Sequence, residues 1–171
     1  MKKIILFIAM ILLVASTAQA AWTLKVKDLG YKMDNHIYSF EILCTSDGSA
    51  MSATDLLGIS VAGVPNVDGM TYEIRKKIMQ CMLMVMTVDP GTGGVAPDTT
   101  IDITLGELSG KPQYSHATFP ATFDVASSYG KLYEDFGQYI PVGATLYATI
   151  SDIGTAGDQV TLRFDGWVED K

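Results

Sequence analysis

The residues with the clearest capacity for chemistry are methionines grouped around one cysteine. Met79, Met82, Met84 and Met86 surround Cys81. Thioether sulfur is a soft ligand that selects Cu(I), and side chains at alternate strand positions point to the same side, so the last three methionines would share one face. Methionine also fills irregular apolar cores. We therefore expect core packing and no metal, with a copper site at Met82, Met84 and Met86 as the alternative.

The two cysteines of the chain leave two alternatives open. Cys44 and Cys81 lie far apart in the sequence, each in an apolar stretch typical of a strand. In an oxidising compartment they could form a disulfide across a sheet, which would contribute about 3–4 kcal/mol in the chain-entropy model. The other alternative is a pair of buried thiols that behave as small apolar side chains.

Two short motifs resemble catalytic signatures. Residues 106–111 are one residue short of a phosphate-binding loop, and Pro112 follows where a helix should begin, so a turn is the better interpretation. Ser128 and Lys131 match a serine–lysine pattern, but the partner motifs of that enzyme class are missing. Neither motif predicts an enzyme.

Other candidate ligands and acid–base groups are few. His36 and His116 are too few for a three-histidine metal site. Residues 89–98 and Asp102 hold three carboxylates in a turn segment, without the regular ligand spacing of a calcium loop. The carboxylates that could pair for hydrolysis are Glu134 with Asp135 and Asp165 with Glu169. We expect all of these to be structural or solvated, and no cofactor.

Charge and composition exclude one class of partner. The chain has 171 residues, of which 48% are apolar and 18% charged, with a formal net charge of −7. It has no basic stripe that could neutralise a phosphate backbone, so nucleic acid is not expected as a partner.

The N-terminus has the pattern of an export signal. Two lysines precede an uninterrupted apolar run at residues 4–14, and residues 18–20 form an A-x-A cleavage pattern. An apolar run of this length is too short to span a bilayer. We expect residues 1–20 to be a cleaved signal peptide and residues 21–171 to be one exported domain, periplasmic or extracellular, without stable membrane insertion.

Period-two alternation recurs along the rest of the chain, which predicts strands. The last two predicted strands flank a glycine-containing loop at 151–158 and would form a C-terminal hairpin. Residues 46–68 predict a long loop or a weak edge element, and residues 125–140 fit either a short helix or irregular strands. The predicted strands are 22–26, 38–44, 78–88, 100–105, 145–150 and 160–165. This pattern predicts an all-β fold, a single antiparallel β-sandwich or jelly-roll-like domain.

Several of these segments together resemble a known group of proteins. The segments are a Cys-Thr-Ser-Asp-Gly turn at 44–48, the turn at 89–98, the strand at 100–105, and a closing pair at 140–150 and 160–164. They resemble small uncharacterised β-rich proteins found among phage and prophage structural genes. The resemblance implies a non-enzymatic virion or appendage component, and it brings no catalytic residues. The predicted signal peptide is a departure from that group.

These observations favour an exported, non-catalytic structural or protein-interaction protein, acting through a protein partner or self-assembly. Tyr129, Tyr133, Tyr139 and Trp167 are aromatic residues of the kind found at contact surfaces. The alternative is a periplasmic soft-metal (copper) or small-ligand binding module built on the methionine strand.

Overall fold

The computed structural model describes residues 21–32, 36–60, 63–89, 91, 101, 103–108, 111–115, 132–142, 145–151 and 153–168. Of these, 106–108, 111–115 and 132–141 are described by their backbone alone. The described chain is mostly β, with one short helix, α2 (Tyr72–Met79).

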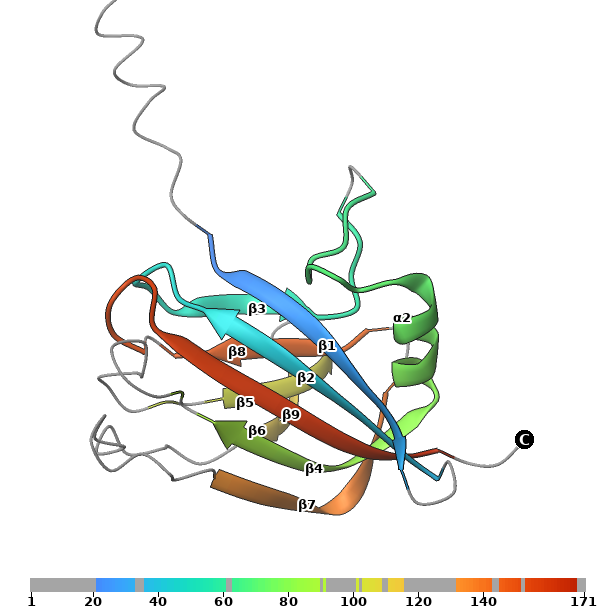
Figure 1. Cartoon of the computed structure of the whole chain (residues 1–171). Coiled ribbons are helices and arrows are strands. Elements are labelled where there is room, and N and C mark those ends of the chain that lie inside the picture. Colours follow the sequence, from blue (N-terminus) through green and yellow to red (C-terminus); the bar gives the residue numbers. More distant parts are fainter. Residues whose placement is uncertain are drawn as a thin grey trace, which may run out of the picture.

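The strands form two antiparallel sheets (Figure 1). The five-stranded sheet has the order β1 (Thr23–Lys32), β2 (Ile37–Thr45), β9 (Gln159–Val168), β4 (Cys81–Asp89), β7 (Leu132–Pro141). The four-stranded sheet has the order β3 (Met51–Asp55), β8 (Tyr147–Ile150), β5 (Ile103–Leu108), β6 (Lys111–Ser115). In Figure 1 the five-stranded sheet faces the viewer and the four-stranded sheet lies behind it. The antiparallel all-β class predicted from the sequence is therefore confirmed.

Apolar side chains from both sheets belong to one hydrophobic cluster. Its centre is the aromatic pair Phe40 and Phe164, which face each other on β2 and β9 with ring centroids 5.0 Å apart. Met86 lies opposite Phe164 on the next strand, β4, and all three side chains are fully buried. The alternation predicted for residues 38–44 is confirmed, since Phe40 and Cys44 point into this core.

The predicted C-terminal hairpin is wrong. β8 pairs with β3 and β5 in one sheet, whereas β9 pairs with β2 and β4 in the other. The connecting segment buries Ile153 completely, and Gly157 N donates to Ser46 O at 2.9 Å. The main chain of Asp158 also accepts a bond from Ser46 N at 2.8 Å. These contacts carry the chain from one sheet to the other, where alternation alone had predicted a local turn.

The strand predicted at 78–88 begins too early, because its first residues end helix α2. The Thr71 hydroxyl accepts a hydrogen bond from Ile74 N at 3.2 Å and caps the helix start. Ile78 is buried as part of this helix, and β4 begins only at Cys81. The last helical turn and the strand share one continuous apolar stretch. The hydrophobic pattern therefore gives no signal for the boundary between them.

The remaining predictions are resolved in part. The weak edge element expected within 46–68 is the short strand β3, and β7 accounts for the end of 125–140 as strand. Residues 1–20, where the signal peptide is predicted, lie outside the described residues. In the part of the chain that is described, no helix has the length and apolar character needed to cross a membrane.

Candidate functional site

The three methionines of the copper hypothesis do not share a face. β4 has a bulge at Met84, where the register to β9 shifts between Leu83 and Val85. Before the bulge, Met82 lies opposite Trp167, and after it Met86 lies opposite Phe164 in the core. The extra residue inverts the alternation, so Met82 and Met86 are on opposite faces of the sheet. The prediction of one shared face is therefore wrong, and the copper hypothesis loses its geometric basis.

The structure also decides between the two alternatives for the cysteines, which are both buried free thiols. Cys44 is level with Val160 on β9, and Cys81 is level with Val168 at the other end of the same strand. At about 3.4 Å per residue these positions are roughly 25 Å apart. A disulfide needs Cα atoms within about 7 Å, so the disulfide alternative is excluded within one chain and the buried-thiol alternative holds.

Both thiols are expected to be unreactive in the folded protein. Burial raises the pKa of Cys44 and of Cys81 to about 12, which leaves about one thiolate in ten thousand at pH 8. We expect no labelling by iodoacetamide in native buffer and two labels in urea, with no mass change on reduction. Labelling of either cysteine at native pH 8 within minutes would contradict the burial.

The other motifs found in the sequence do not assemble a catalytic group among the described residues. Residues 106–108 end β5 and Lys111 begins β6, and these two strands pair antiparallel. Residues 109 and 110, between the two strands, lie outside the described residues. Asp165 accepts hydrogen bonds from Ser39 and from Arg163 Nη2, the latter at 3.2 Å. His36 stacks on Trp167, with ring centroids 5.0 Å apart. Within the described ranges no group of three His, Cys, Asp or Glu side chains lies close enough to hold a metal ion.

Several candidates cannot be placed. The side chains of Glu134, Asp135, Tyr133 and Tyr139 are not described, although their backbone belongs to β7. The candidates that lie outside the described residues altogether are Asp98, Asp102, His116, Ser128, Tyr129, Lys131 and Glu169.

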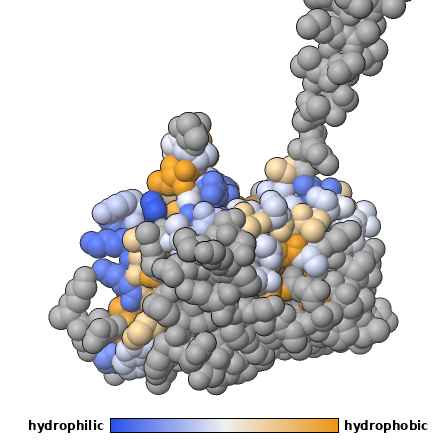
Figure 2. Space-filling view, turned by 180° about the vertical axis from the view of Figure 1, so that it is seen from behind, coloured by the Kyte–Doolittle hydropathy of each residue, from blue (hydrophilic) through white to orange (hydrophobic). Residues whose placement is uncertain are grey.

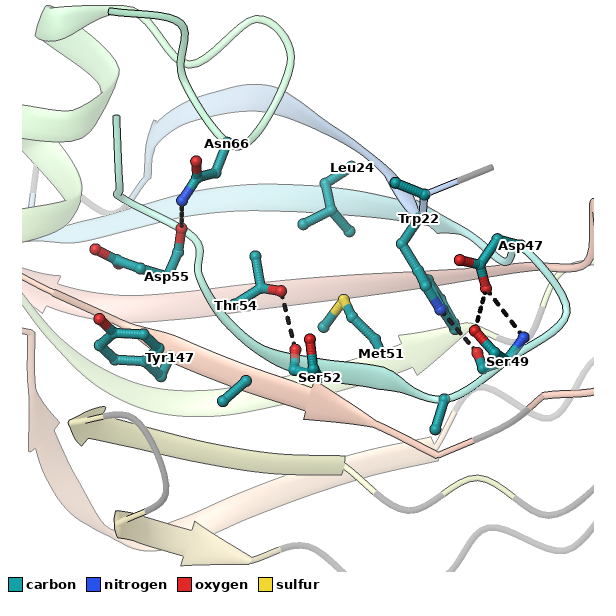
Figure 3. A pocket seen from close by; sticks show the side chains of 13 residues that line it. Trp22, Leu24, Asp47, Ser49, Met51, Ser52, Thr54, Asp55, Asn66 and Tyr147 are labelled. Atoms are coloured by element: carbon teal, nitrogen blue, oxygen red, sulfur yellow. Dashed lines mark hydrogen bonds between the residues drawn. The ribbon is translucent and has the colours of Figure 1, made fainter. Parts of the chain in front are cut away.

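Among the described residues, a groove of about 680 Å³ lies between the start of β1 and the outer edge of β3 (Figure 3). That volume is within the range of ligand pockets in proteins. All five residues of β3 line it, together with residues from the start of β1, the β2–β3 turn, the 58–66 loop and β8. The lining residues are Ala21, Trp22, Leu24, Asp47, Ser49, Ala50, Met51, Ser52, Ala53, Thr54, Asp55, Asn66 and Tyr147.

The groove exists because β3 is an edge strand. In the described part of the chain β3 pairs with β8 alone. Its register shifts between Met51 and Thr54, so Ser52 and Ala53 have no partner in the β8 ladder. Proteins usually protect such edges, because unpaired main-chain groups attract another strand. The side of β3 that faces away from β8 opens into the groove.

The neighbouring edge, β1, is protected in the usual way. Asp68 forms a parallel bridge with Lys25. Its main chain donates to Leu24 O at 2.8 Å and accepts from Val26 N at 2.9 Å. Lys25 and Lys27 add exposed charges along β1, a common device against edge pairing. Of the two edges beside the groove, β3 is therefore the open one.

Side chains close the two ends of the groove by binding main-chain carbonyls (Figure 3). At one end Trp22 Nε1 donates to Ser49 O at 2.8 Å. At the other end Asn66 Nδ2 donates to Asp55 O at 2.9 Å. These bonds fix the length of β3 that lies open between them.

Asp55 also holds the groove to the rest of the fold. Its Oδ1 accepts hydrogen bonds from Leu57 N at 3.0 Å and from Leu146 N at 3.1 Å. The second bond joins the end of β3 to the residue before β8. At the opposite end, Asp47 Oδ1 accepts from the main chain and the hydroxyl of Ser49. Both carboxylates of the groove therefore support its walls.

An apolar loop projects beside the groove. Its described residues are 58–60 and 63–66, and a bridge between Ile59 and Pro65 closes its base. Ile59 is 55% exposed and Val64 is 60% exposed. Figure 2 shows hydrophobic side chains on this projection, next to a hydrophilic region of the surface. Because Asn66 lines the groove, the loop forms a raised wall at that end.

The sequence pattern alone does not identify these residues as a site. Trp22 is the second residue after the predicted cleavage site, and the pattern places it only in a strand. For the stretch 46–68 the sequence predicts a long loop or a weak edge element, and the second alternative is the strand β3. Trp167, expected to be exposed, is half-buried against His36, whereas Tyr72 on α2 is 75% exposed.

Away from the groove, a partly exposed ion pair between Lys77 and Asp28 is relevant to stability. Lys77 Nζ lies 3.0 Å from Asp28 Oδ2 and 5.6 Å from the centre of the buried Tyr38 ring. Burial raises the pKa of Asp28, but hydrogen bonds from Lys77 and from Gly30 N, with the charge of Lys77, lower it below 3.8 overall. The folded protein therefore favours the ionised form of Asp28.

This pair predicts a pH dependence of stability. A carboxylate with a lowered folded-state pKa stabilises above its unfolded value and loses that contribution as pH falls through the folded value. We expect Asp28→Asn to lower the free energy of unfolding by about 0.5–1 kcal/mol at pH 7. This difference from the unsubstituted protein should shrink as the pH falls through the folded-state pKa of Asp28. Urea unfolding at pH 7, 4 and 2.5 measures this. Lys77→Ala should weaken the dependence of the free energy of unfolding on pH over the same range. If this dependence is unchanged in both variants, the pairing is contradicted.

Comparison with known proteins identifies no relative: no protein-family model, no curated protein and no solved structure matches this chain.

Proposed function

We propose that this chain is an exported, non-catalytic protein-interaction protein with a β-sandwich architecture, which binds a protein partner at the groove beside β3. The observation that carries this proposal is the open edge of β3, which lines a groove of about 680 Å³. An edge strand left accessible is a recognised route for one protein to bind another.

Two further features support an interaction surface at this place. The exposed Ile59 and Val64 stand on the loop that walls one end of the groove. Exposed apolar side chains grouped beside a polar groove are typical of contact surfaces. A partner in the groove would cover both features together.

The use of the polar groups in the groove supports a binding role rather than catalysis. Asp55 Oδ1 is occupied by two main-chain donors, and Asp47 Oδ1 by the donors of Ser49. Through these Oδ1 atoms both carboxylates hold loop geometry, which is a supporting role. The sandwich arrangement is supported by the single cluster to which both sheets contribute, and export by the N-terminal pattern of the sequence.

The experiment is photo-crosslinking in cells that export the protein. A photoreactive p-benzoylphenylalanine replaces Ser52 on β3 in one variant. In the matched control it replaces Thr23, an exposed strand residue that is not part of the groove lining. We expect a discrete adduct from position 52 and none of that mass from position 23. Absence of an adduct at 52, or the same adducts from both positions, would refute the proposed function.

No second function is proposed. The bulge at Met84 places Met82 and Met86 on opposite faces of the sheet, so no specific observation favours copper binding. Because no known protein matches, the resemblance to phage structural proteins adds no support to the proposal.

A further inference from the structure

We propose that the occupant of the groove is an extended segment of a partner protein that carries Lys or Arg and adds as a new strand to the outer edge of β3. This inference rests on the proposed function and names the chemistry of the partner. Three features of the groove support it: the open main chain of β3, the apolar residues of the lining, and the negative charge of the lining.

The main chain of β3 offers a template of suitable length. Its five residues span about 17 Å in extended conformation, and all five line the groove. Trp22 and Asn66 occupy the carbonyls of Ser49 and Asp55, so an added strand would pair with the residues between these two positions. Recognition through main-chain hydrogen bonds is the usual mode of strand addition.

The middle of the template holds an exchangeable hydrogen bond. Ser52 O accepts from the Thr54 hydroxyl at 2.9 Å. This contact is local and exposed, so an incoming N–H can replace it at small cost. Ser52 and Ala53 make no ladder pairs with β8, and pairing on the outer side would not disturb the existing sheet.

The lining favours an alternating sequence in the occupant. Leu24 and Met51 are the buried apolar residues among those that line the groove. A strand places alternate side chains on opposite faces, so one set can cover these two residues while the other set reaches the polar rim. Apolar and charged residues in alternation satisfy both.

The charge of the groove selects a basic occupant over a second copy. Asp47 and Asp55 are the charged lining residues, one at each end, and the lining contains no Lys or Arg. Complementary charge favours a cationic segment. Antiparallel pairing of two β3 strands would instead turn the Asp55 end of each copy toward the Asp47 end of the other. Like charges in such a position oppose self-association.

Binding can be followed by fluorescence of a tryptophan inside the groove. Trp22 and Trp167 are the two tryptophans of the chain, so a Trp167→Phe background reports on Trp22 alone. The probe is the peptide acetyl-Val-Lys-Val-Lys-Val-amide, and the matched control has Glu in place of Lys. We expect saturable binding of the lysine peptide, at least about tenfold weaker binding of the glutamate peptide, and weakening of the former by salt.

Backbone methylation distinguishes strand addition from simple charge attraction. Only alternate N–H groups of an added strand face the neighbouring strand. Two further lysine peptides are therefore N-methylated, one at its odd and one at its even positions. We expect one of the two to lose binding and the other to retain it. Equal affinity for both methylated peptides would overturn the proposed strand addition.

Variants of the protein locate the site. Ser52→Lys places a cation and a long side chain in the groove and should abolish binding of the lysine peptide, whereas Thr23→Lys should leave it unchanged. Asp47→Asn should reduce affinity about threefold, the size expected for one exposed charge pair. Equal binding to the Ser52→Lys and Thr23→Lys variants would place the peptide elsewhere and overturn the inference.

Failure of this inference is distinguishable from failure of the proposed function. If position 52 crosslinks to a partner but none of the peptides binds, the groove is an interaction site without strand addition. If the adduct at position 52 is a second copy of this chain, the proposed function stands and the basic partner is refuted. If neither experiment gives a signal, both proposals fail.

Discussion

Replacing Phe40 with alanine is expected to lower the free energy of unfolding by about 4 kcal/mol, the middle of the range for truncating a buried aromatic residue. Phe40 is fully buried and stacks on Phe164, with ring centroids 5.0 Å apart, and on Tyr38, at 6.1 Å. Truncation removes both ring contacts and leaves a cavity in the core, on the buried face of β2 and β9. A protein of this size should then lose roughly 10 °C or more in melting temperature.

Urea unfolding followed by circular dichroism measures this effect, and Phe40→Leu is the matched control. Leucine keeps most of the volume and should cost about 1.5 kcal/mol or less. The denaturant slope should stay unchanged if both variants unfold from the same fold. A loss below about 1 kcal/mol for the alanine variant would contradict the burial of Phe40 against Phe164 and Tyr38.

The agreement between sequence and structure is best where side-chain alternation continues without interruption. Tyr38, Phe40, Ile42 and Cys44 occupy alternate positions of the strand, and all four are buried as predicted. A strand with one buried face has a strongly specified register. For such a segment the pattern alone identifies both the strand and the residues that face the core.

The predictions fail where one residue or one long-range contact changes the geometry. The bulge at Met84 inverts the alternation of β4, and a pattern of apolar residues on both faces contains no signal for it. The segment 151–158 resembles a hairpin loop, but it connects strands of two different sheets, and Ile153 is fully buried. Both features depend on partners that are distant in the sequence.

The groove could not be predicted because it depends on which edges remain open. β1 and β3 are both edge strands, and the bridge between Asp68 and Lys25 covers only the first. That bridge joins residues more than forty positions apart, so no local pattern indicates it. Composition predicted a weak edge within 46–68, but the open edge and the side chains that close its ends required the fold.

Asp55→Ala is expected to lower the free energy of unfolding by about 2–3 kcal/mol, because one carboxylate oxygen accepts two main-chain hydrogen bonds. Oδ1 holds Leu57 N at 3.0 Å and Leu146 N at 3.1 Å, and the side chains of both leucines are buried. Alanine would leave these two N–H groups without their acceptor at a junction between β3 and β8. The groove should lose its shape together with the stability.

Asp55→Asn separates this supporting role from the charge. The amide oxygen of asparagine can accept the same two hydrogen bonds, so we expect a loss of stability below about 1 kcal/mol. Binding of the lysine peptide should nevertheless weaken about threefold, because the negative charge is gone. Paired urea unfolding and Trp22 fluorescence titrations measure the two effects on the same samples. If Asn lowers stability as much as Ala, the charge of Asp55 itself holds the fold. If Asn leaves peptide affinity unchanged, Asp55 supports the groove without selecting its occupant.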